Sequence, residues 1–377
     1  LDAFLYDMSR AGELPGTEEL TQGRGLEFTP YMTGRMKDMF GLGPRAWQGA
    51  GGLDFTWRFT PTLAAVFTGN TDFAETEVDA RQVNLTLFDL FFPEKRAFFL
   101  EGANQFEFGL GLGRNFIPFF TRRVGLLRGQ QVPIEAGVKL NGRVGRWNLA
   151  MLDVRTRDSS LAPATNLFAG RASYDLNQDL RVGTLVTYGD PEGRKQNTLA
   201  GFDAVWRTSK FQGDKNLLIG GWTAVSAGDV PEGRRSGWGF KIDYPNDLWD
   251  CKLIINEFGD ALSPALGFLP RPGTRQSLTG CEYMPRPSKT GALRFIRQAF
   301  FETAYSRVTN LRGINESWNA QVVPLKMQFE SGDALELQWA PQYEWLPEPF
   351  EIVAGVAIPP GAYRFNRWNL EAQTSPH

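Results

Sequence analysis

Histidine chemistry has almost no basis in this 377-residue sequence, because its one histidine is the last residue, His377. Ser-His-Asp or Cys-His catalysis and His-ligated zinc all need an imidazole held inside a site. Carboxylates are abundant, and Asp72, Glu75, Glu77 and Asp79 form a quartet whose hard oxygen ligands suit a divalent cation such as calcium. Their spacing does not match an EF-hand loop. We therefore favour a solvated segment and predict no metal site and no cofactor.

A second charged group lies in residues 91–102 (FFPEKRAFFLEG), which contain two pairs of phenylalanines. Glu94, Lys95 and Arg96 lie between the two pairs, and Glu101 follows the second pair. Pro93 cannot donate to a strand ladder, so the segment suits a turn or an inward fold better than a central strand. One hypothesis is a constriction or gate whose charges line a lumen. We favour the other, a structural plug whose ions pair with strand residues such as Arg122 and Arg123, because an unpaired buried charge is costly.

Other candidate chemistry is weaker. Glycoside hydrolysis needs two carboxyl groups about 5–10 Å apart, and the 42 acidic residues include no pair that the sequence singles out. The run GLGLG at 109–113 lacks the Lys-Ser/Thr of a phosphate loop and indicates a flexible connection. Cys251 and Cys281 suit a disulfide in an oxidising compartment or two separate thiols. We predict no catalytic residue.

The composition excludes several classes of protein. The 40 Lys and Arg nearly balance the 42 Asp and Glu, and 42% of the residues are hydrophobic, which excludes a disordered chain. Basic residues are scattered singly among acidic ones, so no nucleic-acid partner is expected. No apolar stretch approaches the roughly 18 residues of a membrane-spanning helix. The 41 Gly, 29 Phe and 11 Trp favour a long β chain with many turns and aromatic bands.

Hydrophobicity alternates with a period of two along most of the chain, as at 53–59 (LDFTWRF) and 238–244 (WGFKIDY). Similar runs occur at 25–36, 62–70, 116–127, 134–141, 147–155, 165–176, 180–188, 198–208, 216–226, 249–255, 276–284, 292–306, 317–329, 335–339 and 361–372. Turn signals such as Asn141-Gly142 separate them, and short connections contrast with long polar ones. The pattern predicts an antiparallel meander of roughly sixteen or more strands, with a turn side and a loop side.

The two faces of these runs favour a membrane barrel over a soluble sheet protein. One face is rich in Trp, Phe, Tyr and Gly, and the other carries charged and amide side chains in mid-strand. A closed barrel can place such an aromatic face against lipid and leave no strand edge unpaired in the bilayer. A soluble multi-sheet protein or propeller is the alternative, although no blade-length repeat is present.

Several motifs make the sequence more specific. They are NTDFAETEVD at 70–79, VNLT at 83–86, FFPEKRAFFLEG at 91–102, PFFTRRVGL at 118–126, VPI at 132–134, GVKLNGRVG at 137–145 and LGFLPR at 266–271. In this order they resemble a family of bacterial outer-membrane β-barrels of unknown function. Members of that family usually carry an N-terminal domain similar to family-nine carbohydrate-binding modules. The resemblance covers roughly residues 25–290, and this chain lacks the carbohydrate-binding-like domain.

We therefore expect residues 1–24 to link to a missing upstream domain. Residues 25–377 should form an outer-membrane β-barrel, its C-terminal part truncated, with 70–108 as a plug or constriction. The expected surroundings are outer-membrane lipid and lipopolysaccharide, and the expected partners are glycans or surface and periplasmic proteins. The leading hypothesis is a non-enzymatic channel, uptake component or surface scaffold. A membrane-associated carbohydrate-active hydrolase and a structural barrel that anchors partner proteins are the alternatives.

Overall fold

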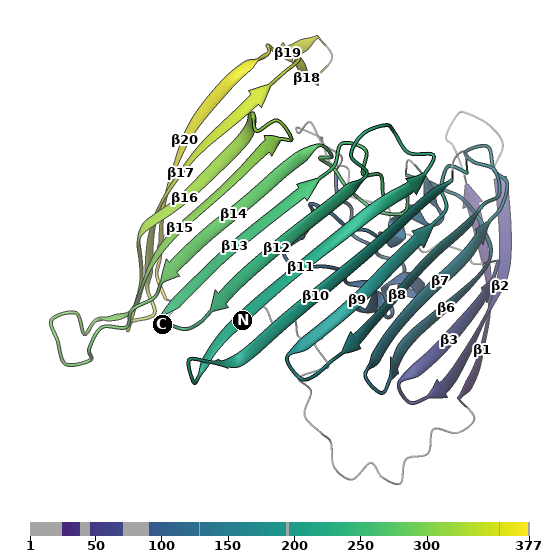
Figure 1. The fold of residues 1–377 in the computed structure, drawn as a ribbon, viewed down its shortest axis with the longest axis horizontal. Helices are drawn as coiled ribbons and strands as arrows, with labels where there is room; N and C mark the ends of the chain where they lie inside the picture. The colour runs from purple at the N-terminus through teal and green to yellow at the C-terminus, as the bar shows by residue number, and fades with distance from the viewer. Residues whose placement is uncertain are drawn as a thin grey trace, which may run out of the picture.

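The computed structural model describes residues 25–37, 46–70, 90–127, 129–193, 196–353 and 355–375. Within these ranges, sixteen strands form one antiparallel sheet in the order β1-β2-β3-β6 through β17-β20 (Figure 1). Its strands are β1 Leu26–Lys37, β2 Ala46–Thr60, β3 Leu63–Gly69, β6 Ile134–Val144, β7 Trp147–Thr156, β8 Asn166–Asp175, β9 Leu180–Tyr188, β10 Asn197–Phe211, β11 Lys215–Gly228, β12 Ser236–Pro245, β13 Trp249–Phe258, β14 Thr274–Tyr283, β15 Ile296–Asn310, β16 Asn315–Phe329, β17 Ala334–Leu346 and β20 Gly361–Gln373. The predicted all-β, antiparallel class is confirmed.

Smaller elements occupy the connections. Two short hairpins pair β4 (Leu126–Leu127) with β5 (Gln130–Gln131) and β18 (Phe350–Val353) with β19 (Val356–Ile358). The helical pieces are α1 Ala97–Leu100, η2 Ala103–Phe106 and η3 Thr121–Arg123. In the described part of the chain, no helix has the length and apolar character needed to cross a membrane.

The sheet is strongly curved, and β1 and β20 are its two edges (Figure 1). Across the described ranges, no strand pairing joins these two edges. Every strand except the two edge strands pairs with the strand before it and the strand after it in the sheet, and all these pairings are antiparallel. Short turns join neighbouring strands on one side of the sheet, as at residues 145–146 and 212–214.

Strand register divides the side chains into two sets. Trp238, Ile242 and Leu253 lie on one face, which we call the outer face. Arg171 and Asp203 lie on the opposite, concave face, which we call the inner face. The separation follows from the pleat, because successive side chains of a strand point to opposite sides.

Residues 90–125, which belong to the connection between β3 and β6, pack on the inner face, and we call them the inner segment. The strands around the inner segment are called the wall. Apolar residues of the inner segment, of the wall and of the connection between β13 and β14 form one buried cluster, which we call the dry cluster: Phe99, Phe108, Leu112, Phe116, Phe119, Val124, Ile134, Leu152, Val154, Leu167, Ala169, Leu185, Leu199, Trp222, Ala224, Phe258, Leu262 and Leu266. The inner face of β6–β13 is therefore largely filled with protein.

The strand predicted at 116–127 is wrong. These residues form an irregular path with the short helix η3 and only Leu126–Leu127 in a strand. The backbone N–H groups of Ile117 and Phe120 donate to the carbonyls of Phe268 and Leu266, in the connection between β13 and β14. Alternating apolar residues here pack against a wall and a loop instead of entering the sheet.

Candidate functional site

The contact between the inner segment and the wall centres on a buried ion pair. Arg171 of β8 and Asp203 of β10 face each other across β9, with Nη1–Oδ1 and Nη2–Oδ2 distances of 2.5 and 2.9 Å. Both side chains are nearly inaccessible, at 5% and 7% exposure. Gly183 of β9 makes this possible, since a Cβ there would lie 2.5 Å from the Arg171 guanidinium. A bidentate geometry offsets part of the desolvation cost of both charges.

The same pair holds the inner segment. Arg171 Nε donates to the carbonyl of Glu107, and the N–H of Gly109 donates to Asp203 Oδ2. The Phe108 ring lies over the guanidinium at 5.4 Å. Three consecutive residues of the inner segment are thus bound by two charged side chains of the wall, which fixes the depth and direction of the segment.

A second anchor is Lys139 of β6, which is 3% exposed. Its Nζ donates to the carbonyls of Phe98 and Glu101 and to Glu101 Oε2, and it lies 4.6 Å from the Phe98 ring centroid. An ammonium with three donors is well suited to close a turn of backbone carbonyls.

A third anchor joins β11 and β13 to the glycine run. Trp222 Nε1 donates to Asn256 Oδ1 at 3.1 Å, and Asn256 Nδ2 donates to the carbonyl of Gly111 at 3.4 Å. Gly239 between them leaves the required room, because a Cβ there would lie 2.1 Å from Asn256 Oδ1. Gly109 and Gly111 have φ of 67° and 76°, a conformation that glycine adopts without strain.

Glu94 and Arg96 stabilise the inner segment internally. Arg96 donates through Nε and Nη2 to the two carboxylate oxygens of Glu94. Its Nη2 also donates to the carbonyl of Thr121, and its Nη1 donates to that of Val124. Thr121 Oγ1 donates to Glu94 Oε2. Burial acts to raise the pKa of Glu94, but hydrogen bonds and the charge of Arg96 outweigh it, so this pKa is lowered. Glu94 is therefore ionised and fully bonded.

The structure places the other predicted residues as follows. Glu101 pairs with Lys139, and the backbone N–H of Lys95 donates to Glu94. Arg122 and Arg123 lie in η3, not in a strand, and Glu94 pairs with Arg96 instead of with them. Arg122 donates to the carbonyl of Pro93, and Arg123 donates to that of Gly267. A short helical turn brings these arginines to backbone carbonyls, which corrects the predicted pairing.

Two further predictions concern the acidic quartet and the segment boundaries. Asp72, Glu75, Glu77 and Asp79 lie outside the described residues, as do 1–24. The described residues include no cluster of three or more His, Cys, Asp or Glu suited to a metal. The segment predicted to end at 108 continues on the inner face through Phe116, Phe119 and Val124.

Cys251 and Cys281 are direct partners in the β13–β14 ladder and are joined by a disulfide bond. They lie on the outer face. The sequence alone is compatible with this disulfide and with two separate thiols.

The anchors Arg171, Asp203, Lys139 and Trp222 were not singled out as site residues. The sequence does contain a signal that could have identified Arg171. Residues 149–152 (LAML) are apolar on both faces, and Arg171 is flanked on its own face by Ala169 and Leu167. A charge in mid-strand among apolar neighbours on the inner face indicates that something covers that face.

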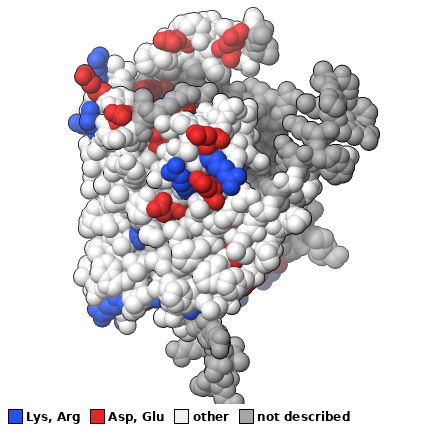
Figure 2. All heavy atoms as spheres, turned by 90° about the vertical axis from the view of Figure 1, so that its right-hand side faces the viewer, with Lys and Arg blue, Asp and Glu red and all other residues white. Residues whose placement is uncertain are grey.

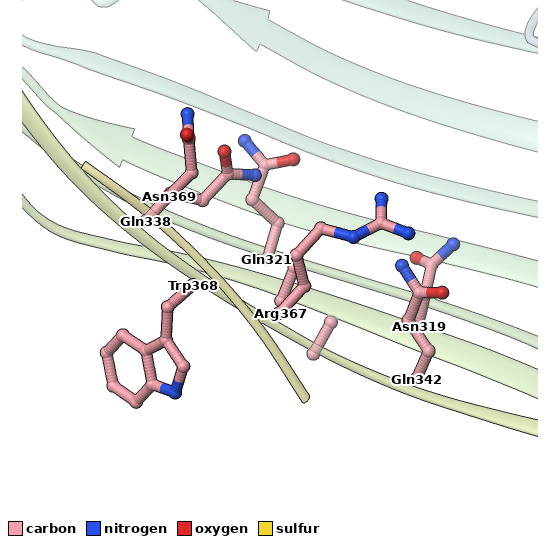
Figure 3. Close-up of a pocket in the computed structure, with 9 residues that line it drawn as sticks. Asn319, Gln321, Gln338, Gln342, Arg367, Trp368 and Asn369 are labelled. Atoms are coloured by element: carbon pink, nitrogen blue, oxygen red, sulfur yellow. The ribbon is translucent and has the colours of Figure 1, made fainter. Parts of the chain in front are cut away.

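The inner face of β16, β17 and β20 is different, because it is polar and open. A hollow of about 460 Å³ is lined there by Asn319, Gln321, Gln338, Ala340, Gln342, Arg367 and Asn369, with Trp368 beside it. Figure 3 shows the amides and the Arg367 guanidinium pointing to one side of the sheet and the Trp368 ring to the other. No member of the dry cluster lies in these three strands.

The outer face carries aromatic side chains near both strand ends. On the turn side, ring pairs include Trp147–Tyr174, Trp249–Tyr283 and Phe211–Tyr244, and on the loop side they include Tyr305–Trp318 and Trp318–Tyr343. Apolar side chains such as Leu253, Phe240 and Val186 lie between these two bands and are exposed. Most of the surface in Figure 2 is uncharged, with a central charged patch and further charges near the ends.

Comparison with known proteins gives one family match. The model of a domain of unknown function, DUF5916, matches residues 24–140, which contain the motifs at 70–102. No curated protein matches this chain.

Among solved structures, OccAB2 of Acinetobacter baumannii is 11% identical, with a TM-score of 0.36, over 92% of this chain and 97% of that one. OpdL of Pseudomonas aeruginosa is 10% identical, with a TM-score of 0.40, over 92% and 88%. OccK8 (OprE) of Pseudomonas aeruginosa is 10% identical, with a TM-score of 0.37, over 93% and 85%. Scores this low carry no detailed correspondence.

Proposed function

We propose that this chain forms a non-enzymatic channel or uptake barrel of the bacterial outer membrane, kept narrow at rest by the inner segment. The observation that carries the proposal is the division of the sheet into an outer face with exposed aromatic and aliphatic side chains and an inner face with buried ion pairs. A large exposed apolar surface with two aromatic bands suits contact with lipid between two aqueous phases.

The position of the inner segment is evidence for a channel of restricted cross-section. Arg171, Asp203 and Lys139 of the surrounding strands bind backbone carbonyl and N–H groups of the segment, so they hold it in place. Because Glu94 is bonded to Arg96 and Thr121, it acts as a structural element of the plug and does not line a path. A plug held by several buried polar contacts limits the open area of the pore without closing all of it.

The proposal is tested with purified protein in two steps. A folded membrane barrel should require detergent, and it should migrate differently on a gel before and after boiling. In a planar lipid bilayer, the folded protein should then give discrete conductance steps. A protein that stays soluble and monomeric without detergent contradicts the membrane location, and a folded, inserted protein without conductance contradicts the channel.

A further inference from the structure

We infer that solutes pass along the inner face of β16, β17 and β20, over an amide-lined wall that favours uncharged, hydroxyl-bearing molecules. This inference rests on the proposed channel function. It assigns the path to one side of the interior and names the groups that a passing solute meets.

The first step is that the other side of the interior is filled. Inner-face residues of β7 to β11, such as Val154, Ala169 and Leu185, have 0% exposure beneath the inner segment. Passage there would require displacement of Phe108 and Phe116 from the dry cluster and rupture of the Arg171–Asp203 contacts with residues 107–109. A solute crosses more easily where no such contacts exist.

The second step is that, among the residues that the structure describes, no member of the dry cluster covers the inner face of β16, β17 and β20. Its hollow of about 460 Å³ lies in the range of about 300–1,000 Å³ typical of small-molecule sites. The lining side chains reach into this space from three neighbouring strands (Figure 3). Gln338 faces Asn369 in the β17–β20 ladder, and Asn319 faces Gln342 in the β16–β17 ladder.

The third step concerns chemistry. Each of the five amide side chains carries a carbonyl acceptor and an NH₂ donor, so together they match the donor and acceptor character of hydroxyl groups without adding charge. Arg367 is the one ionised side chain of the hollow, and it lies opposite Ala340, whose small side chain leaves the guanidinium free space. Uncharged hydroxylated solutes therefore find many weak partners along this wall.

The location is tested by cysteine labelling during conductance measurements. The native Cys251 and Cys281 are bonded to each other, so an introduced thiol is the reactive one. Gln338→Cys places it on the open wall, and Thr187→Cys places it on the inner face of β9, where Thr187 is 1% exposed. A charged methanethiosulfonate reagent should lower the conductance of the Gln338→Cys protein and leave that of the Thr187→Cys protein unchanged.

The solute class is tested by swelling of liposomes in sucrose. The double variant Gln338→Leu/Asn369→Leu should slow sucrose entry by about threefold or more, the loss expected for one or two hydrogen bonds, while KCl conductance changes less. Gln328→Leu, an amide of β16 outside the hollow, is the matched control and should behave like the wild type. Gel mobility before boiling verifies that each variant is folded.

The outcomes separate the two proposals. Absence of conductance in the folded wild type overturns the channel and this path together. If the reagent blocks the conductance of the Thr187→Cys protein but not that of the Gln338→Cys protein, the proposed path is wrong and the channel function still stands. Unchanged sucrose entry in the double variant overturns the solute class.

Discussion

At the scale of single residues, Arg171 and Asp203 show why the charged inner face is stable. Each charge is buried, and each is satisfied by the other and by the backbone of residues 107 and 109. Removal of one partner leaves the other as an uncompensated buried charge, whereas removal of both does not.

We therefore expect Arg171→Met to lower the free energy of unfolding by about 3–5 kcal/mol. The double variant Arg171→Met/Asp203→Leu should be more stable than either single variant. Urea unfolding of the folded protein in detergent measures both effects. Single variants within about 1 kcal/mol of the wild type would show that the charges are not buried together.

The bonding of Glu94 predicts how the free energy of unfolding depends on pH. Burial opposes its ionisation, but Arg96 lowers its pKa below the ordinary glutamate value of 4.5. A lowered pKa in the folded state stabilises the fold above pH 4.5, and this stabilisation is lost as the pH falls through the folded-state pKa.

Glu94→Gln should therefore be less stable than the wild type at pH 7, and the difference should shrink as the pH falls below 4.5. The measurement compares urea unfolding of the two proteins between neutral and acid pH. A stability difference that stays constant or grows in acid would contradict the assignment of the ionised form.

At the scale of elements, the sheet strands could be predicted from the sequence, but the contacts that anchor the inner segment could not. Period-two alternation located the strands of the sheet because the pleat forces it. The same alternation at 116–127 produced a false strand, since Phe116 and Phe120 contact the wall and a loop. Pro93 indicates that the segment leaves the sheet, but the anchors of the segment depend on contacts between residues up to 145 positions apart, such as Gly111 and Asn256.

The packing of the inner segment yields a prediction about gating. Phe116 is 1% exposed and lies 5.2 Å and 5.7 Å, between ring centroids, from Trp222 and Phe258. Phe116→Ala should destabilise the docked segment by about 3–5 kcal/mol, which should raise conductance and make residues 90–125 sensitive to protease. Phe301→Ala, on the exposed outer face, is the control and should change neither. A Phe116→Ala protein with the conductance of the wild type would mean that the segment does not restrict the pore.

At the scale of the whole molecule, the two faces of the sheet have opposite tolerances for charge if the outer face meets lipid. Leu253 lies on the outer face of β13, between Ile242 and Thr279 of the adjacent strands, and is 37% exposed. Ala304 lies on the inner face of β15, between Gly280 and Gln321. Both residues lie in mid-strand, so their backbones make the same kind of ladder hydrogen bonds. Their side chains differ in the surroundings that they meet.

Leu253→Lys should lower stability by about 2–4 kcal/mol in a bilayer, the cost of a lysine near the midplane of a barrel's lipid face. Ala304→Lys should fold nearly as well as the wild type, because its ammonium enters a polar interior. Folding yield into lipid vesicles, followed by gel mobility before boiling, measures both. In a soluble sheet protein, Leu253→Lys would place the ammonium in water and cost little stability, whereas Ala304→Lys would place it in the interior and be the damaging change. Which of the two variants folds with the lower yield therefore distinguishes a membrane barrel from a soluble fold.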